Sequence, residues 1–410
     1  MIEATAPCET QSRIPITKPN FGDAEFAAVR EVLESGWLVQ GPKVAEFERR
    51  FAELTGSRNA VATTSCTTAL HLLLVAAGVG RGDSVILPAF TFVASANAVE
   101  YTGARPQFID IDLKTFNIDS EQVAQFLETR ASANAKCLLP VSLFGLCAEM
   151  PSLNRLAERH GLRVIEDAAC GFGARREGRH AGTEVWAGAF SLHPRKAITT
   201  GEGGMIVTDD DELASQLRRL RDHGASATDL QRHLESGGSL LPEFNQLGYN
   251  YRLTDIQAAL GLVQLETAAT MIEQRRTLAE RYNKLLSDCP RMILPTEPGG
   301  YRHAYQSYVC LFGADSIEEL IAADISQIET WNRERNQLMA ALETEGIATR
   351  QGTHALHTLG FYRGKYGLES TDFPNAFRAD RLSLALPLYP QLTAQDQHRV
   401  ADTLKRHIPA

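Results

Sequence analysis

From about residue 40 to residue 210, short apolar runs alternate with longer amphipathic segments. The short runs are rich in β-branched residues, as buried strands are, and the longer segments repeat apolar residues at spacings of three and four, as helices packed on a sheet do. This alternation predicts parallel βαβ units. The predicted strands are Asn59–Thr63, Ser84–Leu87, Arg105–Ile109, Cys137–Val141, Arg163–Ile165, Ala187–Ser191 and Gly204–Thr208. The predicted helices between them are Thr68–Ala77, Ala94–Glu100, Glu121–Arg130 and Ser152–His160.

The pattern changes after Thr208. A helix is expected over Asp211–His223, a polar loop over 225–239, and a long helix from Thr254 to about Leu286 that bridges two domains. A chain of 410 residues exceeds what one core usually supports. The fold class predicted is therefore α/β, with a large domain built on a mostly parallel seven-stranded sheet and a smaller C-terminal α/β domain. The expected division is an N-terminal extension over 1–13, a large domain over 14–269 and a small domain over 270–410. The later elements expected are a strand at Gln306–Leu311, a helix at Trp331–Glu345 and a final helix after Leu392.

Composition narrows the classes of partner. The formal net charge of −9 disfavours a nucleic-acid partner, which relies on dense Lys and Arg. No stretch offers the roughly 20 apolar residues that a membrane span needs, and a cytoplasmic location is expected. Seven cysteines without C-x-x-C pairs predict neither a disulfide framework nor a metal site.

Lys196 lies between two predicted strands, in the run Leu192-His-Pro-Arg-Lys-Ala-Ile-Thr-Thr-Gly-Glu-Gly203. A proline turn followed by glycines permits close approach of a ligand to the backbone. An amine presented there is placed to form an imine with an aldehyde. Taken alone, a lysine near glycines is more often a solvated surface residue.

Asp167 follows an apolar strand and precedes the small residues Ala-Ala-Cys170-Gly. Ligands of open parallel sheets gather beyond the carboxyl ends of the strands, so Asp167 marks where a cofactor would lie. A carboxylate there could pair with a pyridinium nitrogen and keep it protonated, as pyridoxal phosphate requires. The alternative is that Asp167 caps the next helix.

Three further segments carry candidate binding residues. Ser65 to Thr68 place hydroxyls at a predicted helix start, where Thr67 and Thr68 could bind phosphate or could simply cap the helix. Phe92 follows another strand and could stack on a planar cofactor or pack in the core. Asn250 and Arg252 open the long helix, where they could reach an anion or act as caps.

These segments together resemble the nucleotide-sugar aminotransferases of the DegT/StrS family, a branch of the aspartate-aminotransferase-like fold (pyridoxal-phosphate fold type I). The resemblance runs from about Ile14 to the C-terminus. Its most specific feature is the combination of S-x-H-P-x-K, T-G-E-G-G and E-D-A-A. The other matching segments are Gly36-Trp-Leu-Val-Gln-Gly-Pro42, Gly82-Asp-Ser-Val-Ile-Leu-Pro88, Val141-Ser-Leu-Phe-Gly145 and Leu386-Pro-Leu-Tyr-Pro390.

The resemblance implies roles for individual residues. Lys196 would be the lysine that bonds to the cofactor aldehyde, Asp167 the partner of the pyridine nitrogen, and Phe92 the stacked ring. Ser191, Thr67 and the backbone of Cys66 would hold the phosphate. Asn250 would come from the other subunit of a homodimer.

Two positions depart from the family pattern. Cys66 stands where glycine is usual, and Cys170 stands where glutamine or histidine is frequent. Cys66 adds bulk beside the phosphate, and Cys170 is a poor hydrogen-bond donor to the cofactor's phenolic oxygen.

The resemblance also implies the reaction. An amino acid, expected to be glutamate, gives its amino group to the cofactor, which passes through pyridoxamine phosphate and delivers it to a keto-sugar in a ping-pong sequence. The segment Ala348 to His357 resembles perosamine-synthase-like members, which aminate a nucleotide-linked 4-keto-6-deoxyhexose. Arg350, Thr353, His354 and His357 are candidate substrate contacts or ordinary loop residues.

Four alternative functions remain open at this stage. The substrate could be a keto-cyclitol. A sugar dehydratase of the same fold carries histidine at the lysine position, and Lys196 argues against it. A lyase acting on cysteine would need a mobile cysteine near the site, and a regulator could retain the fold without catalysis.

Overall fold

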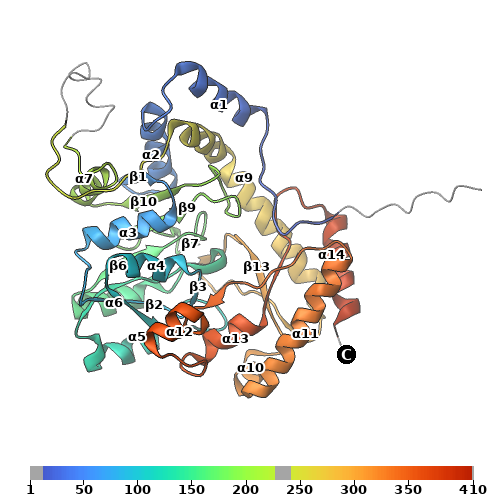
Figure 1. Cartoon of the computed structure of the whole chain (residues 1–410). Coiled ribbons are helices and arrows are strands. Elements are labelled where there is room, and N and C mark those ends of the chain that lie inside the picture. Colours follow the sequence, from blue (N-terminus) through green and yellow to red (C-terminus); the bar gives the residue numbers. More distant parts are fainter. Residues whose placement is uncertain (1–12, 227–241, 409–410) are drawn as a thin grey trace, which may run out of the picture.

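The computed structural model describes residues 13–226 and 242–408. Its centre is a seven-stranded sheet in which only β10 runs antiparallel to its neighbours, so the expected mostly parallel sheet is confirmed (Figure 1). Across the sheet the strands are β1 (Asn59–Thr63), β10 (Gly204–Thr208), β9 (Ala187–Ser191), β6 (Arg163–Asp167), β5 (Ala135–Leu138), β2 (Ser84–Pro88) and β4 (Arg105–Ile109).

Helices cover both faces of this sheet, because successive strand residues point to opposite sides and are buried on both. On β10, Ile206 joins one hydrophobic cluster, whereas Met205 and Val207 join another. The first face carries α3 (Cys66–Ala76), α4 (Ala94–Tyr101) and α7 (Asp211–Leu220). The second carries α2 (Pro42–Thr55), α5 (Ser120–Leu127), α6 (Met150–His160) and part of α9 (Asp255–Leu285).

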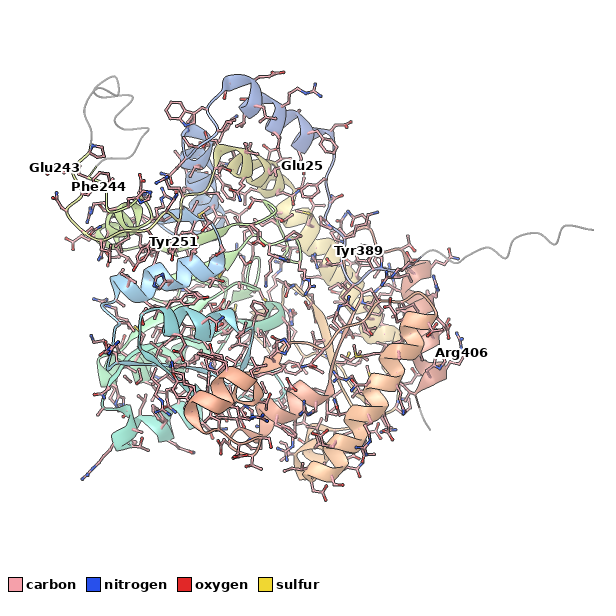
Figure 2. The ribbon with its side chains drawn as sticks, viewed as in Figure 1. Glu25, Glu243, Phe244, Tyr251, Tyr389 and Arg406 are labelled. Carbon is pink, nitrogen blue, oxygen red and sulfur yellow. The ribbon has the colours of Figure 1, made fainter. Side chains whose placement is uncertain are left out.

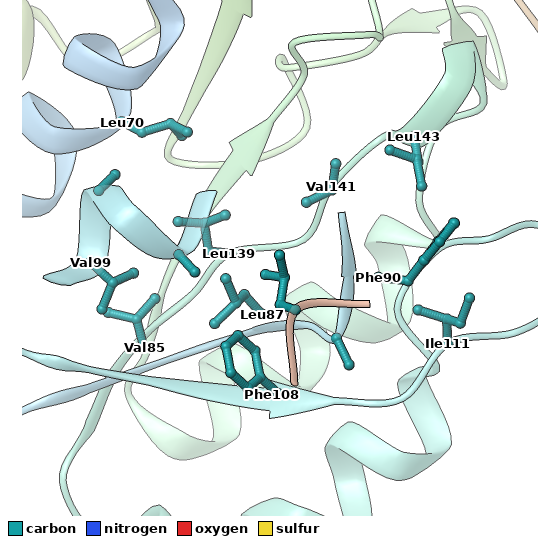
Figure 3. Packing of buried hydrophobic residues seen from close by; sticks show 14 of the residues in the cluster. Leu70, Val85, Leu87, Phe90, Val99, Phe108, Ile111, Leu139, Val141 and Leu143 are labelled. Carbon is teal, nitrogen blue, oxygen red and sulfur yellow. The ribbon is translucent and has the colours of Figure 1, made fainter. Parts of the chain in front are cut away.

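The core beneath α3 and α4 consists of aliphatic and aromatic side chains in mutual contact. Figure 3 shows Leu70 of α3 and Val99 of α4 on the same side of the sheet as Val85 and Leu87 of β2. All four side chains are at most 1% exposed. This packing fixes the start of both helices relative to the strand ends.

Two N-terminal helices, α1 (Asp23–Ser35) and α2, pack against α9. Asp255, at the start of α9, accepts hydrogen bonds from the backbone N–H groups of Gly41, Lys43 and Val44. One carboxylate thereby satisfies the free N–H groups at the start of α2 and joins it to α9.

The long helix α9 connects the central sheet to the C-terminal part, as expected (Figure 1). Residue 270 lies inside this continuous helix, and the domain division at that point stays a prediction. The C-terminal part contains a three-stranded antiparallel sheet, β11 (Met292–Ile293), β13 (Tyr308–Phe312) and β15 (Ser383–Leu386). Its helices are α10 (Ile317–Ala322), α11 (Ile325–Thr344), α12 (Gly360–Tyr366), α13 (Pro374–Leu382) and α14 (Ala394–His407).

Short elements complete the fold. Ile14 packs in the C-terminal core and pairs with Ile347. One small sheet joins β12 (Tyr301–Arg302), β7 (Arg175–Arg176) and β8 (Arg179–His180), and another joins β14 (His354–Ala355) to β3 (Phe90–Thr91). Three 3₁₀ turns lie at Arg130–Ser132, Leu143–Gly145 and Leu356–Thr358.

The predicted strand Cys137–Val141 is observed as Ala135–Leu138, which begins two residues earlier and ends three residues earlier. Pro140 has no N–H to contribute to the ladder, which ends the regular strand before it. Pairing continues beyond the proline as a single bridge between Val141 and Asp167. Among residues 13–226 and 242–408, no helix is long and apolar enough to cross a membrane.

Candidate active site

A cavity of about 580 Å³ lies beyond the carboxyl ends of the parallel strands. It extends from the large sheet to the segment around residues 350–353 and 385–388 of the C-terminal part. Most residues predicted for the site line this cavity. They are Cys66, Thr67, Phe92, Asp167, Cys170, Ser191, Lys196, Arg350 and Thr353.

Lys196 reaches the cavity from the turn that follows β9. The turn is fixed by backbone hydrogen bonds from Lys196 N–H to His193 and from Leu192 N–H to Gly203. From the C-terminal part, Gln306 Nε2 donates to the carbonyl of Arg195. The lysine is thus presented by backbone that both parts of the chain hold in place.

The Lys196 amine lies 3.1 Å from Cys170 Sγ and donates a hydrogen bond to it. Burial acts to lower the pKa of Lys196, but its interactions with Cys170, Cys66 and Asp167 outweigh burial and raise this pKa. The groups that influence the amine most, apart from burial, are therefore two thiols and a carboxylate.

Asp167 ends β6 and is 5% exposed. Its Oδ2 accepts a hydrogen bond from Ser95 Oγ at 2.6 Å, and its Oδ1 accepts one from Ala169 N–H at 3.1 Å. Burial raises the pKa of Asp167, and these hydrogen bonds and Lys196 act in the opposite direction. The carboxylate is held in one orientation beside the cavity that also contains Lys196.

Glu166, the adjacent residue, points to the other face of the sheet. Its carboxylate accepts hydrogen bonds from Ser142 Oγ at 2.5 Å and from Gly182 N–H at 2.6 Å. Burial raises the pKa of Glu166 to about 7. Of this acidic pair, only Asp167 lines the cavity.

Helix α3 begins at the cavity. Ser65 is its N-cap, and Ser65 and Thr68 form a reciprocal capping box. Thr68 therefore uses its hydroxyl for the cap, whereas Thr67 lines the cavity. The first helical N–H groups, with their partial positive charge, lie at the position where an anion could bind.

Cys66 and Phe92 lie near this helix start in the cavity lining. The thiol of Cys66 is buried and faces Asp167, with Sγ 3.9 Å from Oδ1. Burial also raises the pKa of this thiol well above its ordinary value. Phe92 is 61% exposed although it lines the cavity, so its ring is available to a ligand and to a partner molecule.

Besides Thr68, four predicted residues do not line this cavity in the described part of the chain: Asn250, Arg252, His354 and His357. Arg252 neither caps α9, whose N-cap is Thr254, nor faces the cavity; its Nη1 donates to Asp222 Oδ1 at 2.6 Å. Asn250 is exposed, and its backbone pairs with Asp222. His354 is exposed on β14, and His357 is buried, with its Nε2 3.4 Å from the carbonyl of Ser370.

Sequence reasoning missed several contributors, among them Arg195, which lines the cavity beside Lys196 on the same turn. Ser95 binds Asp167, and Gln306 fixes the lysine turn; Ile16 and Thr17 line the cavity from the N-terminal segment. Ser95 leaves one weak signal, a polar residue at the start of the predicted helix Ala94–Glu100. Gln306, Ile16 and Thr17 are placed by contacts between distant segments.

Comparison with known proteins identifies the family of the chain. The family model for DegT/DnrJ/EryC1/StrS aminotransferases matches residues 19–405. The spore coat polysaccharide biosynthesis protein SpsC of Bacillus subtilis (strain 168) is 37% identical, over 96% of this chain and 96% of its own length.

Two solved structures share the fold at comparable identity. Spr1654 of Streptococcus pneumoniae, solved in its PLP form, has a TM-score of 0.85 at 27% identity and covers 96% of this chain and 98% of its own. DesI, solved in the presence of its TDP-sugar product, has a TM-score of 0.82 at 30% identity and covers 98% of this chain and 94% of its own. The chain therefore belongs to the DegT/DnrJ/EryC1/StrS aminotransferase family, which consists of sugar aminotransferases that depend on pyridoxal phosphate.

Proposed function

We propose that this enzyme transfers an amino group from glutamate to a keto-sugar linked to a nucleotide, most specifically a 4-keto-6-deoxyhexose. The observation that carries the proposal is the location of Lys196 and Asp167 in the lining of one cavity. The two substrates use this cavity in turn, with the amino acid first and the sugar second.

The residues present fit pyridoxal phosphate. An amine, a buried carboxylate and the start of a helix surround a volume within the range of roughly 300–1,000 Å³ typical of small-molecule sites. Lys196 would hold the aldehyde end, Asp167 the ring nitrogen, and Thr67, Ser191 and the backbone at Cys66 the phosphate. When bound, the cofactor supplies a ring that withdraws electrons from the carbon that loses its proton.

In this proposal the side chains of the protein transfer protons and hold the cofactor ring in its protonated form. Lys196 accepts a proton at Nζ as general base and returns it as general acid. Asp167 keeps a proton on the ring nitrogen, and Ser95 and the Ala169 N–H fix the carboxylate for that task. Because Asp167 is held from both oxygens, it does not have to reorient during turnover.

The nucleotide-linked sugar is supported by two features. Arg350 and Arg195 line the cavity and can attract an anionic group such as a diphosphate. DesI, which is similar over nearly the whole chain, was solved with a TDP-sugar product. Arg350 and Thr353 are proposed to contact the substrate, whereas His354 would need to move to reach this cavity.

We also propose that the enzyme is a cytoplasmic homodimer with shared active sites. The described residues expose several large apolar side chains, and exposed apolar side chains that gather in one patch commonly mark a protein–protein interface. Figure 2 shows one of them, Phe244, at the outer edge of the molecule. The others include Phe26, Leu33, Leu38, Val39, Phe92, Tyr101 and Leu247. Asn250 is exposed and lies close in sequence to Phe244 and Leu247, from where it could enter the partner's cavity.

Replacing Lys196 with alanine removes the amine that captures the cofactor. We expect Lys196→Ala to remain folded but to lose both covalently bound pyridoxal phosphate and transamination. Borohydride reduction followed by peptide mass spectrometry measures the first, and an assay of amino transfer measures the second. Full transamination by this variant would refute the assignment.

Replacing Asp167 with asparagine keeps the shape of the side chain but removes its charge. We expect kcat to fall by about 10²-fold or more, because a fixed charge opposite a developing charge contributes that much in comparable sites. Steady-state kinetics and thermal unfolding should be measured together. No helix directly follows Asp167 in the described chain, so the alternative helix-cap role is excluded, and a loss of stability with unchanged kcat would instead support a structural role in which Asp167 holds the turn after β6 through the Ala169 N–H.

Subunit complementation tests the shared site. Lys196→Ala and Asn250→Ala are each expected to be nearly inactive. If Asn250 acts across the interface, each mixed dimer formed on co-expression contains one intact site. Because random pairing makes about half of the dimers mixed, about a quarter of all sites are restored. If Asn250 acts within its own subunit, no intact site forms and the mixture stays inactive.

A panel of acceptors tests the substrate. With glutamate as donor, GDP-, TDP- and UDP-linked 4-keto-6-deoxyhexoses should yield amino-sugars that mass spectrometry identifies. A free keto-cyclitol should react much more slowly, because it lacks the diphosphate that Arg350 and Arg195 attract. Preference for the cyclitol would overturn this choice of substrate while leaving the aminotransferase activity in place.

A further inference from the structure

We propose that Cys170 is a positioning residue for Lys196, and that its sulfur holds the lysine amine whenever this amine is not bonded to the cofactor. The inference rests on the proposed function, in which Lys196 is free during each turnover. It gives the thiol a partner within the protein itself, in addition to any contact with the cofactor.

Backbone contacts hold Cys170 and Lys196 independently. Cys170 lies in the turn after β6, which is closed by a hydrogen bond from Gly171 N–H to the carbonyl of Ala168. A Cβ on Gly171 would lie 2.9 Å from Ala181 Cβ, so this turn is packed tightly and its position is fixed. The lysine turn is fixed by its own backbone hydrogen bonds. The 3.1 Å contact between Lys196 Nζ and Cys170 Sγ therefore joins two turns that are each held in place separately.

The charged and titratable groups that face Lys196 come from three elements. Asp167 lies at the end of β6 and Cys170 in the turn that follows it, Cys66 lies at the start of α3, and His193 lies on the lysine turn. Burial has the largest influence on the pKa of Lys196 and lowers it. Cys170 has the next largest influence and raises this pKa. Cys66 and Asp167 raise it less.

A held, protonated amine has a direct chemical consequence. Only the neutral amine attacks an aldehyde, so a partner that favours the protonated form moves covalent capture of the cofactor to higher pH. Sulfur is a weak acceptor that releases a hydrogen bond more readily than a carboxylate does. Cys170 therefore holds the amine without trapping it.

The test uses the full-length enzyme freed of cofactor and then mixed with pyridoxal phosphate. The rate of covalent capture at Lys196 is followed between pH 6 and pH 10 by borohydride quenching and mass spectrometry. In Cys170→Ala we expect the midpoint of this profile to fall by about one pH unit, equal to about tenfold faster capture below both midpoints. In Cys170→Ser, which keeps a hydrogen-bonding atom, the midpoint should stay nearer to that of the wild type.

Cys66→Ala is the matched control, because this thiol lines the same cavity but faces Asp167. Its midpoint should shift less than that of Cys170→Ala. Superimposable profiles for the wild type and Cys170→Ala, or an equal shift in Cys66→Ala, would overturn the inference while covalent capture itself still supports the proposed function. Absence of capture at Lys196 in the wild-type enzyme would overturn both.

Discussion

A carboxylate buried at the end of a central strand is the constraint on which the site depends. Burial of an ionisable group is costly unless hydrogen bonds and an opposite charge compensate for it. Asp167 receives bonds from Ser95 and from the Ala169 N–H, and it faces the amine of Lys196. These partners come from α4, from the turn after β6 and from the turn after β9, so the folded arrangement is needed to stabilise the acid.

The parallel sheet explains why these partners meet. β6 and β9 are parallel neighbours, and Asp167 pairs with Ala189 two residues before β9 ends at Ser191. Their carboxyl ends open on the same edge, where α3 also begins. Residues separated by more than 100 positions thus surround one cavity, and the helices packed on both faces hold the strand ends still.

The strands of the large sheet and most residues that line the cavity could be predicted from local sequence patterns. The strands of the large sheet are short buried runs bounded by turns, and Asp167, Lys196 and Thr67 follow such runs directly. The helices α1 and α2 were not predicted, because they depend on packing against α9 and on the Asp255 contacts. Gln306 and Ile16 reach the cavity only through pairing of distant segments, and no local pattern marks them. Asn250 and His354 lie outside the lining of the cavity in this subunit.

Two thiols lie beside the principal groups of the site. Cys66 faces the acid and Cys170 faces the amine, so each reactive group has a sulfur neighbour. Both contacts leave the amine and the carboxylate lining the cavity.

A crystal structure of the enzyme loaded with pyridoxal phosphate tests the central claim most directly. The account predicts continuous density from Lys196 Nζ to the cofactor, with a carboxylate oxygen of Asp167 within hydrogen-bond distance of the ring nitrogen. A cofactor bound elsewhere, or a ring nitrogen that faces a residue other than Asp167, would contradict it.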